Sequence, residues 1–282
     1  FEQAGGFMNL GKAVLCGLVQ GLTEFLPVSS SGHLALAHAY LGASDLSSSV
    51  FTFDILLHLA TLVAVVTVYF SDIVSLVPAF FSLVRKVFGR RFRLSECVGE
   101  ERLCLLLLVA SVPLGVAALI GDRVETLSSN PRLVGGILAV NGLFLLLGER
   151  AAHGAKRAEE LTVPRGAFIG LCQLLAILPG LSRSGSTVSG GRLVGLTREE
   201  AVRFSFLLSV PAILGASGLG IVDLFKNPVP KSDIPAYALG MLTALVCGFA
   251  AIGLLRRMAK SSSFRFFAYY CLAVGTAAVI FG

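Results

Sequence analysis

The sequence has few charged residues, no tryptophan and no cysteine spacing typical of a metal site. Only 14% of its 282 residues are charged, whereas an ordinary soluble domain has about 25%. This shortage, together with a mean hydropathy of +0.83, excludes a disordered chain and a large soluble enzyme. The six cysteines form no C-x-x-C or C-x-x-H pair, so we expect neither a zinc site nor a redox site.

What the sequence does contain is hydrophobic runs long enough to cross a lipid bilayer. Hydrophobic residues make up 55% of the chain, and 31 residues are glycine. Apolar runs of about 20 residues favour α-helices over a β-barrel, whose strands alternate over about 10 residues. The sequence therefore predicts an all-α, polytopic membrane protein, with residues 1–282 forming a single integral membrane domain. About six full spans are expected, at residues 50–70, 103–120, 133–148, 204–225, 236–255 and 264–281.

Three further apolar segments do not resemble ordinary spans. Residues 10–36 and 166–188 are interrupted by proline, glycine, serine and charged residues. We expect each of these two to be a re-entrant helix–loop–helix element that enters the membrane and turns back. Residues 73–84 are too few to span and include Pro78, so an interfacial or broken helix is expected there.

The basic residues lie between the apolar runs and predict the orientation of the chain. They gather in the linkers 85–102, 149–165 and 256–265, which the positive-inside rule assigns to the cytoplasm. In this arrangement the two re-entrant elements enter from opposite faces. The net charge of +6 is then explained by topology, and we expect no nucleic-acid partner. Glu149, at a span end, is expected to be solvated.

The two re-entrant runs resemble each other at a separation of 153 residues, except that residues 26–27 match 178–179 one residue out of step. Residues 17–20 align with 170–173, and residues 29–33 align with 182–186. The match includes glutamine, serine and glycine, which chance similarity between apolar segments rarely reproduces. The sequence therefore predicts an inverted-topology repeat, with halves at about 9–150 and 162–282. In such repeats the ligand site lies where the broken helices meet.

The first re-entrant run carries a dense group of polar residues. Gln20 and Glu24 are four residues apart and share one helix face, and Pro27 ends that helix. A carboxylate at membrane depth needs an arginine, a metal ion or a proton, so Glu24 is expected to have one of these partners. Alternatively, this group is solvated at the membrane interface. The residues that follow Pro27 can line a turn at the start of a second helix: Ser29, Ser30, Ser31 and His33.

The second re-entrant run places an arginine among hydroxyl groups. Arg183 offers five donors and a fixed charge, which suit a phosphate or a carboxylate. Alternatively, Arg183 is only the structural partner of Glu24. Asp54 and His58 are four residues apart on a span, and they either face the site or pair with each other. The hydroxyl groups flanking Arg183 are Ser182, Ser184 and Thr187.

Two motifs together resemble a known family. Residues 20–34 read Q-x-x-x-E-F-L-P-V-S-S-S-G-H-L, and residues 179–187 read P-G-x-S-R-S-G-x-T. They closely resemble the bacterial undecaprenyl-pyrophosphate phosphatase family, which is linked to bacitracin resistance. The resemblance implies a hydrolase that converts undecaprenyl pyrophosphate to undecaprenyl phosphate and inorganic phosphate, recycling the lipid carrier of cell-wall synthesis. It also implies a multi-pass protein of the bacterial inner membrane, a site open to the periplasmic side, and frequent homodimers.

The same resemblance, with the chemistry of a diphosphate, suggests roles for individual residues. Arg183 would clamp the phosphates, and Glu24 would hold a divalent cation, Mg²⁺ or Ca²⁺. Ser30 is expected to be the nucleophile, with His33 taking its proton. Many family members have Glu where this chain has Gln20, which can offer a cation only a neutral oxygen. The residues expected to contact the substrate are Gln20, Ser29, Ser31, Ser182, Ser184 and Thr187.

Two questions stay open at this point. The nucleophile could instead be His33, or a water molecule that His33 activates. The function could also belong to another class, because inverted repeats with broken helices are typical of secondary transporters. A transporter or flippase of an anionic polyprenyl phosphate would also need an arginine such as Arg183.

Overall fold

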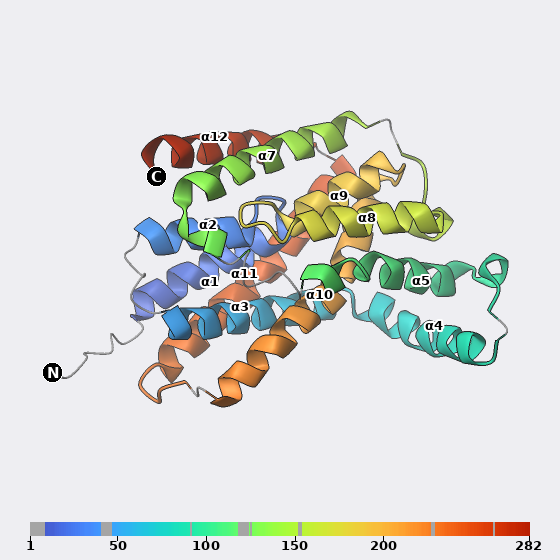
Figure 1. Ribbon diagram of the computed structural model, residues 1–282, viewed down its shortest axis with the longest axis horizontal. Helices are drawn as coiled ribbons and strands as arrows, with labels where there is room; N and C mark the ends of the chain where they lie inside the picture. The colour runs from blue at the N-terminus through green and yellow to red at the C-terminus, as the bar shows by residue number, and fades with distance from the viewer. Residues whose placement is uncertain are drawn as a thin grey trace.

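The chain is helical throughout the part that the structure describes. The computed structural model describes residues 9–40, 47–90, 92–117, 124, 126–151, 154–226, 229–261 and 263–282. The helices, in chain order, are α1 (Leu10–Phe25), α2 (Ser30–Tyr40), α3 (Ser47–Val68), α4 (Phe70–Phe88), α5 (Gly99–Ser111), α7 (Pro131–Arg150), α8 (Val163–Leu175), α9 (Arg183–Leu193), α10 (Arg198–Lys226), α11 (Ile234–Ser261) and α12 (Arg265–Phe281) (Figure 1).

Three of these helices are long and apolar enough to cross a membrane on their own. They are α7, α10 and α11, which include three of the six expected spans. α12 has 17 residues and is shorter than a full span. The expected span at 103–120 is wrong as one continuous helix, because α5 ends at Ser111, close to Pro113, which cannot donate to the helix ladder. Residues 118–120 of that run lie outside the described part.

A sharp corner joins α3 to α4. The two helices meet at Tyr69 and are bent by 86°, so the expected span at 50–70 leads directly into a second helix. α4 is the helix that residues 73–84 predict, although it is longer than expected and contains Pro78. Its exposed phenylalanines and its buried Ala79 and Leu83 give it one apolar face toward the surroundings and one toward the protein.

The outer faces of the long helices are apolar. Only 33% of the apolar window of α11 and 39% of that of α7 are buried inside the protein. The side chains that remain exposed include Leu242 and Val246 on α11 and Leu143 on α7. Monomeric soluble proteins rarely expose so much contiguous apolar surface, so these faces are suited to lipid. The protein is an integral membrane protein.

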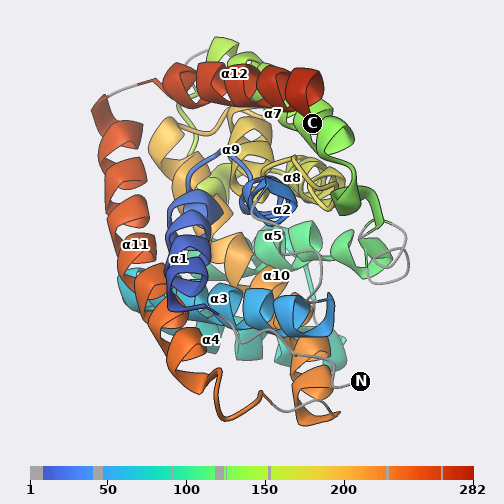
Figure 2. The same ribbon diagram turned by 90° about the vertical axis from the view of Figure 1, so that its left-hand side faces the viewer.

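Glycines allow two pairs of helices to pack closely. α1 lies against α11, and α7 lies beside α12 (Figures 1 and 2). A Cβ atom on Gly21 would lie 2.5 Å from the Ala244 carbonyl oxygen, and one on Gly135 would lie 2.8 Å from that of Gly275. Small residues at such contacts bring helix backbones together, as is usual between membrane helices.

The two predicted re-entrant runs are each a pair of helices joined by a short break. α1 and α2 are separated by residues 26–29, and α8 and α9 by residues 176–182. Figure 2 shows α2, α8 and α9 in the interior, with α1 and α11 along one side and α7 and α12 above. Every residue of α9 from Ser184 to Arg192 is buried. The helix–loop–helix form is therefore confirmed, whereas the inverted repeat and the full set of six spans stay predictions.

Candidate active site

The two helix breaks lie in direct contact with each other. A Cβ atom on Gly32 would lie 2.8 Å from the Gly180 Cα, so the loops touch through their backbones. The Ser184 hydroxyl on α9 donates to the Leu26 carbonyl oxygen at 3.1 Å. The structure thus brings the two polar groups of the sequence together, at the ends of α1 and α8 and the starts of α2 and α9.

Asn141 on α7 holds the two breaks together. Its amide nitrogen donates to the Pro27 carbonyl oxygen at 3.0 Å, and its amide oxygen accepts from the Ser182 backbone N–H at 3.1 Å. Asn141 is fully buried. Asn141 is not among the residues predicted from the sequence, although a single amide within an apolar span is a recognised indication of a polar role.

The two breaks also repeat one hydrogen bond. The Ser29 hydroxyl accepts from the Gly32 N–H at 3.2 Å, and the Ser182 hydroxyl accepts from the Gly185 N–H at 3.0 Å. Both serines therefore cap the helix that follows them. These four positions are related by the same separation that relates the two motifs in sequence. Ser29 differs in having a φ of 72°, a left-handed conformation that is rare outside glycine and typical of functional sites.

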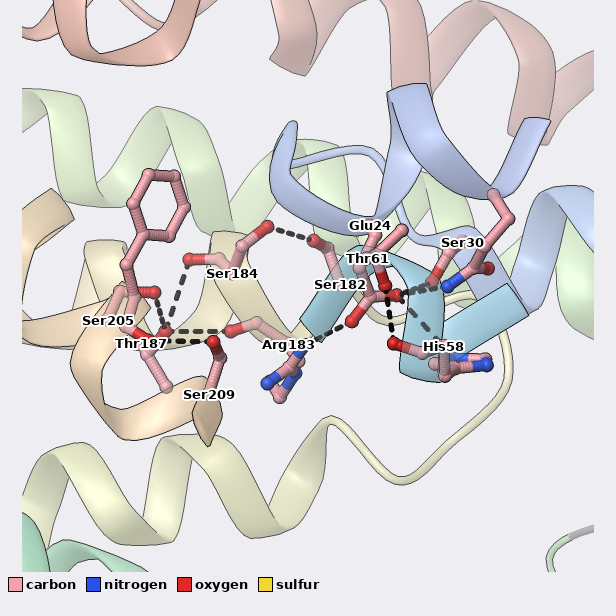
Figure 3. Close-up of polar contacts among 12 residues, drawn as sticks. Glu24, Ser30, His58, Thr61, Ser182, Arg183, Ser184, Thr187, Ser205 and Ser209 are labelled. Carbon is pink, nitrogen blue, oxygen red and sulfur yellow. Dashed lines mark hydrogen bonds and ion pairs between the residues drawn. The ribbon is translucent and has the colours of Figure 1, made fainter. Parts of the chain in front are cut away.

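Glu24 is the centre of the site (Figure 3). Its side chain is 3% exposed, and one carboxylate oxygen, Oε1, accepts a hydrogen bond from the Arg183 Nη2. The other, Oε2, accepts from Gln20 Nε2 at 2.9 Å and from Ser30 Oγ at 2.7 Å. His58 Nε2 lies 3.5 Å from the same oxygen. An arginine, a metal ion or a proton was expected beside this carboxylate, and the structure shows an arginine.

Two polar atoms beside this ion pair have no hydrogen-bond partner among the described residues. They are Arg183 Nη1 and Gln20 Oε1, and both are buried. Buried donors and acceptors are normally hydrogen-bonded, so the lack of a partner at these two atoms needs an explanation. A donor on the arginine and an acceptor on the glutamine are available to a ligand that carries both phosphate oxygens and a cation.

His33 makes its hydrogen bonds with residues other than Ser30. Its Nδ1 donates to the Ser29 carbonyl oxygen at 2.7 Å, and its Nε2 lies 2.9 Å from the hydroxyl of Tyr270 on α12. A carbonyl oxygen can only accept, so in a neutral ring Nε2 accepts the Tyr270 proton. The two rings are also stacked, with an interplanar angle of 8°. The hydroxyl of Ser30 donates to Glu24 instead.

His58 faces the site, one of the two outcomes that the sequence left open. Its Nδ1 donates to the backbone oxygen of Asp54 at 2.8 Å, so an attractive contact between Nε2 and Glu24 requires a second proton on the ring.

Tyr270 is not among the residues predicted from the sequence. It reaches His33 from the far end of the chain.

Three hydroxyl groups expected to contact substrate are engaged in the fold. Ser182 caps α9, Ser184 bonds to Leu26, and Thr187 Oγ1 donates to the Arg183 carbonyl oxygen at 2.9 Å. These bonds fix the first turn of α9 and hence the direction of the Arg183 side chain. Ser31 is exposed and lies 3.3 Å from the Ser29 hydroxyl, oxygen to oxygen.

The site offers a metal ion few ligands of its own. No group of three His, Cys, Asp or Glu side chains suited to a metal ion occurs within the described ranges. Both carboxylate oxygens of Glu24 already accept hydrogen bonds, which leaves Gln20 Oε1 as the acceptor without a partner. Mg²⁺ commonly binds through one or two carboxylates plus substrate phosphates, so these residues fit a cation that arrives with a phosphorylated ligand.

Comparison with known proteins gives consistent matches over nearly the whole chain. A profile of the bacitracin resistance protein BacA family matches residues 13–277. An undecaprenyl-diphosphatase of Desulforapulum autotrophicum is 40% identical over 279 residues, covering 98% of this chain and 99% of the relative. One from Rubrobacter xylanophilus is 43% identical over 272 residues, covering 95% and 96%. One from Methanosphaera stadtmanae is 37% identical over 277 residues, covering 97% and 98%.

Proposed function

Because the chain belongs to the bacitracin resistance protein BacA family, we propose that it hydrolyses undecaprenyl pyrophosphate to undecaprenyl phosphate and inorganic phosphate. It is an enzyme, an undecaprenyl-diphosphatase that recycles the lipid carrier of peptidoglycan synthesis. The observation that best supports this function is the meeting of Glu24, Ser30 and Arg183 where the two family motifs touch. A diphosphate requires charge neutralisation and a positioned nucleophile, and these side chains supply both.

Arg183 binds the diphosphate in this proposal. Its free Nη1 contacts a phosphate oxygen first, and the stronger attraction of the diphosphate then draws the guanidinium from Glu24. Arginine is suited to this role because its planar fork matches two phosphate oxygens at once. Gln20 and the serines at the two breaks supply further contacts.

Ser30 attacks the terminal phosphorus. The Oγ–phosphorus bond forms as the anhydride bond breaks, and undecaprenyl phosphate leaves. Water then hydrolyses the phosphoserine and releases inorganic phosphate. Glu24 takes the proton of Ser30 on Oε2, since the hydroxyl already donates to that oxygen. The departure of Arg183 would leave Oε1, its present partner, available to a cation. The role expected of His33 as base has less geometric support, because both its ring nitrogens have other partners.

A divalent cation, Mg²⁺ or Ca²⁺, accompanies the substrate. Glu24 and Gln20 Oε1 would hold it, and it would neutralise phosphate charge when bound. Glu24→Gln removes the carboxylate from this pair, so the cation concentration needed for half-maximal hydrolysis should rise at least tenfold. Phosphate release is measured against cation concentration for both proteins, with thermal stability recorded alongside. A folded variant with an unchanged cation midpoint would exclude Glu24 as the main ligand.

The matched breaks also support the finer architecture. We infer an inverted repeat with about six spans in the bacterial inner membrane, with the site open to the external side. The shared capping geometry of Ser29 and Ser182 supports the repeat. The substrate is a polyprenyl diphosphate lipid, and a homodimer is the proposed assembly.

The rival function is transport of an anionic polyprenyl phosphate, favoured by the paired broken helices. The two functions are separated by measuring phosphate release from a soluble short-chain prenyl diphosphate in detergent, with and without a chelator. Hydrolysis needs a single compartment, whereas transport needs two. Chelator-sensitive phosphate release is the expected result. No release by folded protein at saturating cation would favour the transporter.

A further inference from the structure

A second cationic site lies at the opposite end of α9 from Arg183. A cavity of about 210 Å³ opens there, lined by Gly154, Arg192, Thr197, Arg198, Glu199 and Ala259. Arg192 is nine residues beyond Arg183, which corresponds to about 13 Å along a helix axis. The lining comes from the end of α9, the start of α10, the linkers after α7 and α9, and the last turns of α11. This is the side that the basic linkers assign to the cytoplasm. This cavity has room for several waters or one hydrated phosphate group.

Arg192 is the residue that needs explanation. It is only 6% exposed, and its Nη1 donates to the Leu196 carbonyl oxygen at 2.8 Å. Its Nε is buried without a hydrogen-bond partner, and no carboxylate lies within ion-pair distance of it in the described part of the chain. A buried charge without a counter-ion is costly. An anion in the cavity would remove that cost.

The neighbouring carboxylates make their hydrogen bonds with residues other than Arg192. Glu149 is not solvated as expected, since its side chain is 4% exposed and bonds to both Arg198 and Ser263. Glu199 is exposed at the rim. Arg198 lies beside the cavity at the start of α10 and is already paired with Glu149, so Arg192 supplies the charge that has no counter-ion.

The walls of the cavity are held firmly. Lys156 and Leu196 form a β-bridge between the linker after α7 and the turn after α9. A Cβ atom on Gly154 would lie 2.1 Å from the Leu196 carbonyl oxygen, so the two backbones are in tight contact. Arg192 is therefore presented to the cavity by a rigid frame, which lowers the entropic cost of binding.

We propose that this cavity is a second anion site, which binds a phosphate group through Arg192 and Arg198. A guanidinium donates two parallel hydrogen bonds to a phosphate more readily than a solvated surface lysine does. The phosphate belongs either to inorganic phosphate or to the headgroup of an anionic lipid. The proposal is independent of the hydrolysis reaction, because none of its residues contacts Glu24 or Arg183.

The absence of tryptophan from the sequence allows a local test. Glu199→Trp places the only tryptophan at the rim of the cavity, on an exposed position. Purified protein in phosphatidylcholine nanodiscs is titrated with inorganic phosphate, against chloride at equal ionic strength. A saturable change in fluorescence with phosphate alone is expected. In nanodiscs that contain phosphatidic acid, a fluorescence that is already shifted and no longer responds to phosphate would assign the site to the lipid headgroup.

Variants identify the residue responsible. Arg192→Gln should abolish the response, and Arg192→Lys should weaken it at least tenfold while keeping the charge. The matched control is Arg257→Gln, which removes an exposed arginine of α11 and should leave the response intact. The response should also persist in Arg183→Ala. The proposal is overturned if neither phosphate nor phosphatidic acid changes the fluorescence of the reporter, if folded Arg192→Gln responds normally, or if Arg183→Ala abolishes the response.

Discussion

At the residue scale, the chemistry of the site depends on how many partners Glu24 has. One buried carboxylate accepts hydrogen bonds from Arg183, Gln20 and Ser30. Any ligand that takes Arg183 therefore changes the basicity of Glu24 and the state of the Ser30 hydroxyl together. In the proposed reaction, binding of the phosphates and activation of Ser30 would be coupled through this carboxylate.

Arg183→Lys tests whether the arginine binds substrate or only balances charge. Lysine keeps the positive charge next to Glu24, so thermal stability should change little. The loss of the planar fork should cost about 2–3 kcal/mol in transition-state stabilisation, or roughly 30- to 160-fold in kcat/KM. The control is Arg257→Lys on the exposed face of α11. Hydrolysis at the wild-type rate in Arg183→Lys would make this arginine a structural counter-ion.

Tyr270→Phe tests the contribution of His33. Phenylalanine keeps the stacked ring but loses the hydroxyl that lies 2.9 Å from His33 Nε2. The expected loss is about 0.5–1.5 kcal/mol, or roughly 2- to 13-fold in kcat, with KM unchanged. Tyr269→Phe is a matched control, because Tyr269 is the adjacent residue and is largely exposed. Equal kinetics for the two variants would mean that the contact of Tyr270 with His33 serves packing alone.

At the element scale, the positions of the two breaks could be predicted and the geometry inside them could not. Pro27 and Pro179 interrupt helical patterns, and this local effect is visible in the sequence. The left-handed φ of Ser29 is not visible, since serine rarely adopts it. That conformation lets the Ser30 hydroxyl donate to Glu24 while His33 turns toward α12. The expected pairing of Ser30 with His33 rested on the family resemblance and on the chemistry of a diphosphate, and neither indicates this backbone geometry.

Asn141→Leu tests whether α7 aligns the two breaks. The substitution leaves the Pro27 carbonyl and the Ser182 N–H buried without their present partner, at a cost of about 1–3 kcal/mol each. Both the melting temperature and kcat should therefore fall. Thr243→Val is the control, since it removes an exposed hydroxyl that bonds only within α11. A stable Asn141→Leu variant with full activity would show that the breaks align without this brace.

At the scale of the whole molecule, charge and hydropathy predict more of the architecture than of the contacts. The long spans α7, α10 and α11 follow from apolar runs, and Glu24 was expected to need a partner such as Arg183. The contacts of Tyr270 and Asn141 with the breaks join residues more than a hundred positions apart, and no local pattern indicates them. Hydropathy alone is not sufficient for the run at 103–120. There the helix ends close to Pro113, and the hydropathy of the run does not indicate that end.

Cysteine accessibility tests the orientation. Five of the six native cysteines are buried, so background labelling should be low. A membrane-impermeant thiol reagent added to intact cells should reach Ser129→Cys but not Lys260→Cys, both of which are exposed positions. Permeabilised cells should label both. Labelling of Lys260→Cys in intact cells would invert the proposed topology.

The composition of α9 has a consequence for how the protein is made. Its eleven residues include two arginines, three glycines and four hydroxyl residues, and each arginine at mid-membrane costs about 2.5–3.5 kcal/mol on the scale for insertion by the translocon. α9 is therefore not recognised as a membrane segment when it leaves the ribosome. Its neighbours α7 and α10 provide the polar contacts and the close packing that it needs. Arg183 should accordingly reach its place late in biogenesis, only after α10 has been synthesised and inserted.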